Sequence, residues 1–308
     1  MKAKLTFLGT GTSQGVPIIA CDCKVCRSED PRDKRYRASA LVEYGGLTIL
    51  IDAGPDFRSQ MLSARVKHLD AILLTHNHKD HTGGLDDVRS FNYVDKKVVE
   101  VFCEEKVLGS LRKEYSYAFA ETKYPGAPEW RVHVIDDSPF AVYPNNKGDL
   151  EWVHDMGYCH RMPDGSLIPT DGNIVSEAEK KSMEQWLSQN DRSGDEPLVI
   201  LPIRGYHDAM PVLGFRFGDI AYITDMSSIP EEEYDKLKGL KHLTLNTVSY
   251  KKHHSHFSLE EAVEIARRVG AEHTWLTHLS HTFPVHEQFC KELPEGIAPA
   301  YDGLVIED

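Results

Sequence analysis

The sequence predicts an α/β protein in which two β-sheets pack face to face and helices cover their outer faces. Two groups of strand-like segments, one before residue 104 and one after residue 196, each carry segments that we interpret as helices. Elements in this arrangement favour layered packing, because each sheet buries one face against the other sheet and one against helices. Hydrophobic residues make up 41% and charged residues 27% of the 308-residue chain, which is typical of an ordinary globular protein.

Short apolar runs bounded by turn formers mark the strands of the first group. Gly45-Gly46 separates two such runs, which is the signal of a two-residue hairpin. The predicted elements are strands at 5–8, 40–44, 47–51, 71–74 and 98–103, and helices at 56–64 and 104–117.

The second group follows the same rules. Gly218-Asp219 predicts another hairpin turn, and Leu259, Ala262, Val263 and Ala266 recur at the spacing of an amphipathic helix. The predicted elements are strands at 197–202, 212–217, 220–224, 242–246, 272–277 and 304–307, and helices at 259–269 and 284–292.

The stretch from about 145 to 196 differs from both groups. It is rich in turn formers and polar residues, and it contains one expected helix near 176–188. Long segments without a regular pattern usually have a role of their own or are mobile. We therefore expect a single domain over residues 1–308 with an insertion at about 145–196.

Charge and apolar patterning limit the partners of the chain. The net charge of −13 argues against nucleic acid as a partner, because affinity for phosphate backbones comes from clustered Lys and Arg. The N-terminus lacks the features of a signal peptide, and no apolar segment is long enough to span a bilayer. We expect a cytoplasmic protein without membrane contact, and the sequence leaves open whether it forms a homodimer.

The strongest chemical signal is the stretch His76-Asn77-His78-Lys79-Asp80-His81, directly after the predicted strand at 71–74. Imidazole and carboxylate groups are good ligands for Zn, Mn or Fe. A His-rich solvated loop is the alternative, but the apolar strand before it fixes the position of the segment. The spacing allows His76 and His78 to face one ion while Asp80 and His81 face another.

A second cluster, Cys21, Cys23 and Cys26, has the spacing C-x-C-x-x-C. Three thiolates suit a structural zinc, which needs a fourth ligand. Three unconnected surface thiols are the alternative, although such a cluster would be prone to oxidation.

The H-x-H-x-D-H pattern resembles the metallo-β-lactamase superfamily, which implies an αββα four-layer sandwich. Leu50–Gly54 is similar to the Asp-x-Gly element of that superfamily, and His207, Asp225 and His278 each lie near the end of a predicted strand in the expected order. The resemblance implies two divalent transition metals, Zn or Mn with Fe as a further candidate. By this resemblance His76, His78 and His207 hold one metal, Asp80, His81 and His278 hold the second, Asp225 bridges them, and Asp52 orients a ligand histidine.

The segment Leu8–Pro17, the cysteine cluster and Leu276–His281 resemble PhnP-type phosphodiesterases of the carbon–phosphorus lyase pathway. This resemblance implies that His281 completes a structural zinc site with the three cysteines. It also places His256 at the active site, where it would act as general acid, and counts Asp80 among the catalytic residues.

The resemblance implies a metal-dependent hydrolase, and most specifically a phosphodiesterase. Its partner would be a small phosphate ester, with cyclic esters among the candidates, attacked by a metal-bridging hydroxide. The alternatives are an endonuclease of the tRNA 3′-processing type and a lactonase or thioesterase of the same fold. A non-catalytic protein of this fold, in which the metals only stabilise the structure, is a further alternative. It is disfavoured because the chain has every ligand of the pattern.

Overall fold

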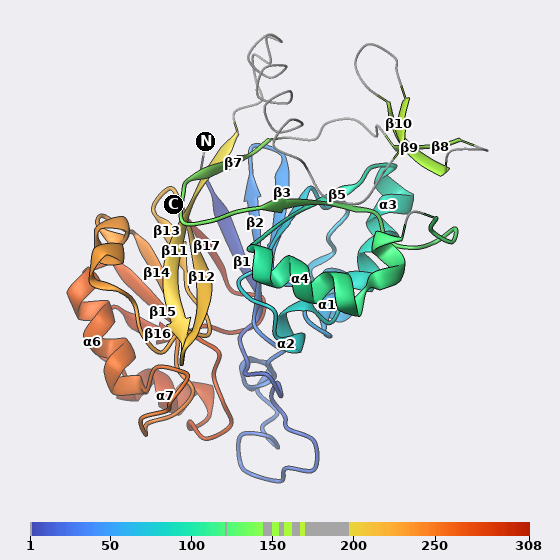
Figure 1. The fold of residues 1–308 in the computed structure, drawn as a ribbon. Coiled ribbons are helices and arrows are strands. Elements are labelled where there is room, and N and C mark those ends of the chain that lie inside the picture. The colour runs from blue at the N-terminus through green and yellow to red at the C-terminus, as the bar shows by residue number, and fades with distance from the viewer. Residues whose placement is uncertain (1, 121, 144–149, 154–156, 162–166, 170–196) are drawn as a thin grey trace.

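The computed structural model describes residues 2–120, 122–143, 150–153, 157–161, 167–169 and 197–308. Two seven-stranded sheets lie face to face, with α1, α3 and α4 outside one and α6 and α7 outside the other (Figure 1). This four-layer arrangement confirms the predicted fold. Among the described residues, no helix combines the length and apolar character that crossing a membrane requires.

The first sheet contains the N-terminal strands together with the last strand of the chain. Its order is β17 (Val305–Glu307), β1 (Lys4–Gly9), β2 (Ser39–Tyr44), β3 (Leu47–Ile51), β4 (Ala71–Leu73), β5 (Val99–Cys103) and β6 (Trp130–Val134). The order of the second sheet is β16 (Ile297–Pro299), β15 (His273–Thr277), β14 (His242–Asn246), β13 (Ile220–Tyr222), β12 (Met210–Phe217), β11 (Leu198–His207) and β7 (Phe140–Val142).

Helices and single turns connect these strands. The α-helices are α1 (Phe57–Ala64), α2 (Lys79–Thr82), α3 (Arg89–Asp95), α4 (Glu105–Glu114), α6 (Leu259–Val269) and α7 (His286–Glu292). The 3-10 turns are η1 (Pro31–Asp33), η2 (Leu85–Val88), η3 (Ser116–Phe119) and η4 (Glu231–Leu237).

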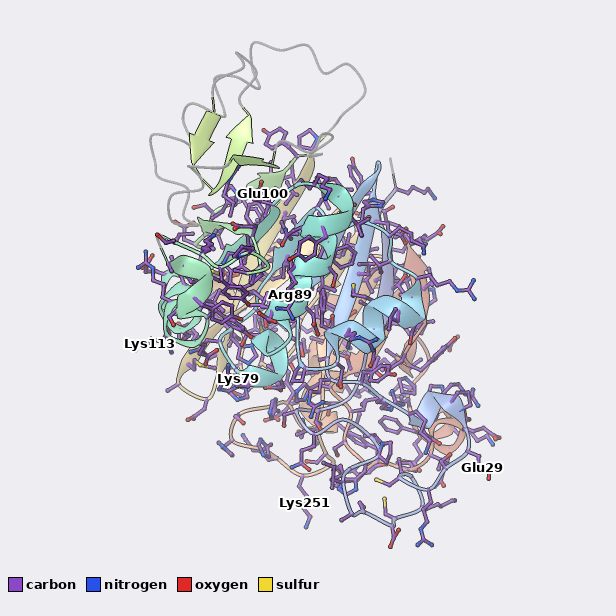
Figure 2. The ribbon with its side chains drawn as sticks, turned by 90° about the vertical axis from the view of Figure 1, so that its right-hand side faces the viewer. Glu29, Lys79, Arg89, Glu100, Lys113 and Lys251 are labelled. Carbon is purple, nitrogen blue, oxygen red and sulfur yellow. The ribbon has the colours of Figure 1, made fainter. Side chains whose placement is uncertain are left out.

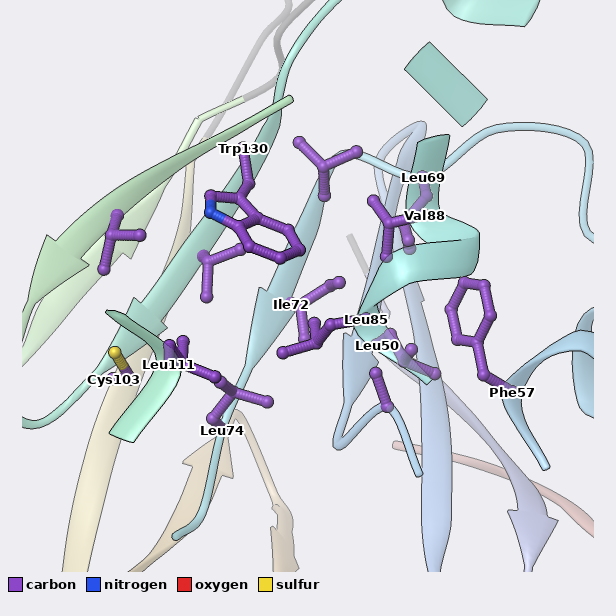
Figure 3. Packing of buried hydrophobic residues seen from close by; sticks show 14 of the residues in the cluster. Leu50, Phe57, Leu69, Ile72, Leu74, Leu85, Val88, Cys103, Leu111 and Trp130 are labelled. Atoms are coloured by element: carbon purple, nitrogen blue, oxygen red, sulfur yellow. The ribbon is translucent and has the colours of Figure 1, made fainter. Parts of the chain in front are cut away.

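Apolar side chains fill the three spaces between the four layers. Between the sheets, the rings of Phe7 and Tyr222 meet with centroids 6.3 Å apart. Outside the first sheet, Trp130, Ile72 and Leu111 belong to one buried cluster (Figure 3). A third cluster packs α6 and α7 against the second sheet. Each fully buried large apolar side chain contributes roughly 1.5–3 kcal/mol, so the layers form a rigid support for the loops at the strand ends.

Both sheets contain a parallel section, and these sections position the candidate site. β3, β4 and β5 are parallel to one another, and so are β13, β14 and β15. The carboxyl ends of neighbouring parallel strands meet at one sheet edge, which is where α/β proteins commonly bind ligands. Asp52 and His76 follow β3 and β4, and Asp225 and His278 follow β13 and β15.

Some predicted elements differ from the structure. The strand expected at 197–202 continues to His207, although Pro202 lacks an N–H. β7 pairs only with Leu198–Ile200, so no described strand lies beside the later part of β11 on that side and Pro202 is tolerated. The helix expected at 104–117 ends at Glu114, and a separate turn η3 follows it.

The predicted insertion is only partly described. Three strands within it, β8 (Leu150–Val153), β9 (Gly157–Arg161) and β10 (Leu167–Pro169), form a small antiparallel sheet. The helix expected near 176–188 lies outside the described residues.

Candidate metal centres

The Asp-x-Gly turn packs directly against the histidine segment. Asp52 has a left-handed backbone, with a φ of 61°, and Ala53 N donates to His81 O at 2.8 Å. A Cβ at Gly54 would lie 2.0 Å from Asp80 O, so only glycine allows the turn to approach α2 this closely. The backbone therefore places Asp52 beside the side chains that follow β4.

The first group of histidines lies at the junction of the two sheets. The ring centroids of His76 and His78 are 4.6 Å apart, and that of His207 lies 5.1 Å from His78. His207 is the last residue of β11, and its Nδ1 lies 3.0 Å from Asp225 O, the distance of a hydrogen bond in which the ring donates. The structure thus brings the three predicted ligands of the first metal together from opposite sheets.

The second group contains two carboxylates and two imidazoles. His81 Nε2 lies 3.3 Å from Asp80 Oδ2 and 3.2 Å from Asp225 Oδ2. His278 Nε2 lies 3.0 Å from the other oxygen of the same carboxylate, Asp225 Oδ1. Since Asp225 also lies within 4.8 Å of a ligand atom of His207, its carboxylate is shared between the two groups.

The donor atoms of both groups fit divalent metal ions. Among the described residues, His76 Nε2 is buried without a hydrogen-bond partner, and His81 Nε2 and His278 Nε2 are buried and face the carboxylate oxygens of Asp80 and Asp225. Buried polar atoms are normally paired, so the unpaired nitrogen of His76 beside these imidazole and carboxylate groups indicates a ligand. A mixed imidazole and carboxylate set suits Zn, Mn or Fe.

Electrostatics agree with this fit. Burial alone would lower the pKa of His81, but Asp225 and Asp52 beside it raise the pKa well above its usual value. Burial would raise the pKa of Asp225, yet the adjacent His278 and His81 hold it well below its usual range. The pocket therefore favours a positive charge between these carboxylates, and a bound cation would replace the imidazolium proton.

His256 faces the shared carboxylate from the loop before α6. Its Nδ1 lies 3.9 Å from Asp225 Oδ1, and its ring centroid is 4.7 Å from that of His278. Ser258 caps α6 in a capping box with Glu261, which fixes the end of this loop. Burial and the neighbouring His278 lower the pKa of His256 to about 3, so the imidazole is neutral in the metal-free protein.

The cysteine cluster lies in the long loop between β1 and β2. His281 Nδ1 is 3.2 Å from Cys21 Sγ and 3.6 Å from both Cys23 Sγ and Cys26 Sγ. The Cys26 N–H donates to Cys23 Sγ at 3.4 Å and lowers the pKa of that thiol to about 6. Figure 2 shows Glu29 of the same loop and Lys251 of the His256 loop at the lower end of the molecule. The four side chains form a compact Cys₃His set, as a structural zinc requires.

Two hydroxyl groups near the centre carried no signal in the sequence. Thr224 Oγ1 donates to Asp225 Oδ2 at 2.7 Å, and Thr75 Oγ1 lies 2.8 Å from Asp52 Oδ2. Each threonine directly precedes a predicted ligand. Only the three-dimensional contacts distinguish them from the many threonines at strand ends.

Comparisons with known proteins agree with the geometry. The family model described as "Beta-lactamase superfamily domain" matches residues 48–154 and 170–279. An octanoyltransferase from Porphyromonas gingivalis is 36% identical over 301 residues, which are 97% of this chain but 50% of that protein, so the chain spans about half of this relative. A ribonuclease Z from Chlamydia trachomatis is 23% identical over 297 residues and 92% of each chain.

A solved structure covers the whole chain. The crystal structure of a new diphosphatase from the PhnP family is 33% identical, has a TM-score of 0.77, and is matched over 100% of this chain and 98% of its own. From the family model and this structural match, the chain belongs to the metallo-β-lactamase superfamily and, within it, to the PhnP type.

Proposed function

We propose that the chain is a metal-dependent phosphodiesterase that cleaves a small phosphate ester, with cyclic esters among the candidates. The observation that carries this proposal is the shared Asp225 carboxylate, whose oxygens lie 3.2 Å from His81 Nε2 and 3.0 Å from His278 Nε2 and which is also within 4.8 Å of a ligand atom of His207. In this proposal His76, His78 and His207 would hold one metal, Asp80, His81 and His278 would hold the second, and Asp225 would be shared by both.

When bound, two divalent cations lower the pKa of water and neutralise charge on phosphoryl oxygens. The side chains of the chain supply position and proton transfer. Asp80 and Asp225 offset the positive charge of the pair. The loop before α6 holds His256 within 3.9 Å of Asp225, where its imidazole can donate to the leaving oxygen. An anionic substrate beside His256 would raise the pKa of this histidine and favour its protonated form.

A hydrolysis panel tests the proposal. The substrates are bis(p-nitrophenyl) phosphate, a 2′,3′-cyclic nucleotide, a nucleoside diphosphate ester, a lactone and an octanoyl thioester, each with and without added Mn or Zn. We expect metal-dependent turnover of the phosphate diesters. The octanoyl thioester is included because of the octanoyltransferase relative. Turnover of the lactone or the thioester without diester turnover would overturn the proposal.

A pair of neighbouring histidines tests the role of His256. His256→Ala should lower diester turnover at least about a hundredfold, the usual range for loss of a general acid, with metal content unchanged. His254→Ala is the matched control, because His254 belongs to the same loop but is exposed. Equal loss in both variants would argue against His256 as the acid.

The ribonuclease Z relatives favour one second candidate, endonucleolytic cleavage of tRNA precursors. The net charge of −13 argues against it, because phosphate-backbone binding needs a basic surface. Cleavage of a tRNA precursor at rates above those for small diesters would support this second candidate over the first.

A further inference from the structure

A single buried carboxylate, that of Asp52, is connected to both halves of the candidate metal centre, to one directly and to the other through Thr75. Its Oδ2 lies 2.7 Å from His81 Nδ1 and 2.8 Å from Thr75 Oγ1. Its Oδ1 accepts the Thr75 N–H at 2.9 Å. Because Asp52 is fully buried, these groups are its hydrogen-bond partners in place of water.

The Thr75 hydroxyl extends this contact to a second histidine. Thr75 Oγ1 lies 2.8 Å from Asp52 and 2.9 Å from His76 Nδ1. A hydroxyl has one proton, and an ionised carboxylate only accepts. Thr75 therefore donates its proton to Asp52, and its oxygen accepts from the Nδ1–H of His76.

This chain of donors determines which nitrogen of each ring carries a lone pair. His76 and His81 both donate through Nδ1, so both present Nε2 to the metal site. Both Nε2 atoms are buried: within the described part of the chain that of His76 has no hydrogen-bond partner, and that of His81 faces Asp80 Oδ2 and Asp225 Oδ2. A metal ligand needs an unprotonated ring nitrogen, and the hydrogen bond of the other nitrogen selects it.

Thr75 is also held by both sheets. Its N–H donates to Asp52, which follows β3 of the first sheet, and its carbonyl accepts from Leu213 N of β12 at 3.0 Å. The Thr75 side chain is fully buried, and as a β-branched residue it has few rotamers. The hydroxyl is therefore fixed relative to ligands that come from either sheet.

We propose that Thr75 is a positioning residue that, together with Asp52, sets the tautomers of ligands in both halves of the centre. Asp52 acts on His81 directly and on His76 through the Thr75 hydroxyl. The inference rests on the proposed function for its assignment of His76 and His81 as metal ligands. The inference predicts different effects for the two residues. Loss of the Thr75 hydroxyl weakens the binding of one metal ion, whereas loss of the Asp52 carboxylate weakens the binding of both.

Metal titration of the metal-free 308-residue chain tests this. Zinc is added in competition with a chromophoric chelator to the wild type and to Thr75→Val, Thr75→Ser and Asp52→Asn. We expect Thr75→Val to weaken one of the two centre ions about 10- to 100-fold, the usual effect of losing an outer partner of a ligand histidine. Thr75→Ser keeps the hydroxyl and should stay within about threefold of the wild type, whereas Asp52→Asn should weaken both ions.

A matched control and a spectroscopic signal exclude a merely structural effect. Thr277 precedes His278 as Thr75 precedes His76 and is equally buried, but within the described residues no hydrogen bond joins its hydroxyl to a ligand histidine. Thr277→Val should leave zinc affinity unchanged. In NMR spectra of the zinc-loaded protein, the hydrogen-bonded Nδ1–H signal of His76 should be present in the wild type and Thr75→Ser and lost in Thr75→Val.

Several results would overturn the inference. The first is that Thr75→Val weakens the binding of both ions equally. The second is that Thr75→Val keeps both its zinc affinity and the Nδ1–H signal of His76. The third is that Thr75→Ser loses as much affinity as Thr75→Val. A wild-type protein that takes up no pair of ions would instead overturn the ligand assignment beneath it. The titration involves no substrate, so its outcome is independent of the hydrolysis panel.

Discussion

The two metal-ligating clusters of this protein are built in different ways. Four of the seven predicted ligands in the first cluster, His76, His81, Asp225 and His278, are at most 2% exposed, and each comes shortly after a strand. The other three, His78, Asp80 and His207, are exposed or half-buried at the mouth of the site. Cys21 and Cys23 are half-buried and lie in a loop whose own apolar cluster contains little more than Val16, Val25 and Cys26. The core surrounds most of the first cluster, whereas polar contacts such as those of Asp33 with the His286 N–H and of Arg35 with Ala300 O are the main links between the loop and the rest of the protein. We infer that the first cluster keeps its shape without metal and that the second depends on its ion.

The largest expected effect is a loss of turnover at the buried centre without a loss of stability. Asp225→Asn should lower diester turnover roughly a thousandfold, because loss of a bridging carboxylate removes several kcal/mol of metal-based stabilisation. Steady-state kinetics and the thermal unfolding temperature are measured together. Asp208→Asn is the control, since Asp208 is exposed beside His207. Unfolding of Asp225→Asn at the temperature of assay would contradict a centre held by the core.

The next effect concerns the loop cluster. Cys23→Ser should lose one metal equivalent and lower the free energy of unfolding by about 2 kcal/mol, because the ion contributes to the folding of its loop. For a chain of this size that is a decrease of roughly 4 °C in unfolding temperature. Cys290→Ser removes an exposed thiol outside the cluster and should change neither quantity. Unchanged metal content in Cys23→Ser would refute the structural-zinc assignment.

A smaller effect is expected from Thr224→Val, which removes the hydroxyl that donates to Asp225 Oδ2 at 2.7 Å. Turnover should fall about tenfold, the lower end for loss of an outer partner, while the unfolding temperature of the metal-free protein changes little. The measurement is kcat/KM at saturating metal. A variant as active as the wild type would show that the core alone orients Asp225.

The smallest effect lies at the capping box of α6. Ser258→Ala removes the side chain that accepts the Glu261 N–H and should cost about 1 kcal/mol of stability. The same turn ends the His256 loop, so kcat should also fall. The decrease should be smaller than in His256→Ala, because the imidazole itself is kept. Denaturant unfolding and kinetics on one preparation check both. A loss of metal from Ser258→Ala would show that the His256 loop also affects how tightly the centre holds its ions, which we do not expect.

The sequence predicted the parts of this molecule that depend on local pattern. The hairpin at Gly45-Gly46 and the helix Leu259–Val269 are confirmed, since turn chemistry and helical spacing are short-range signals. β6, β7 and β16 were not predicted. Two of them, β7 and β16, have only three residues, so their pairing depends on neighbouring strands rather than on their own sequence.

The candidate site divides in the same way. The spacing of His76, His78, Asp80 and His81 is visible locally, and the structure places these residues together. His207, Asp225 and His278 could be placed only by resemblance, because no short-range pattern brings strand ends from two sheets into contact. Thr75 and Thr224 were missed, since a threonine hydroxyl becomes informative only when its partner is known.

The pairing of the first and last strands has a consequence for synthesis of the protein. β1 lies between β2 and β17, and Leu5 pairs with Ile306, about three hundred positions later. At about 5–20 residues per second, a ribosome needs roughly 15 to 60 s between these two segments. During that interval one edge of β1 has no neighbour and is open to pairing with other nascent chains. Chaperone protection of newly made protein should therefore matter most until residues 305–307 emerge.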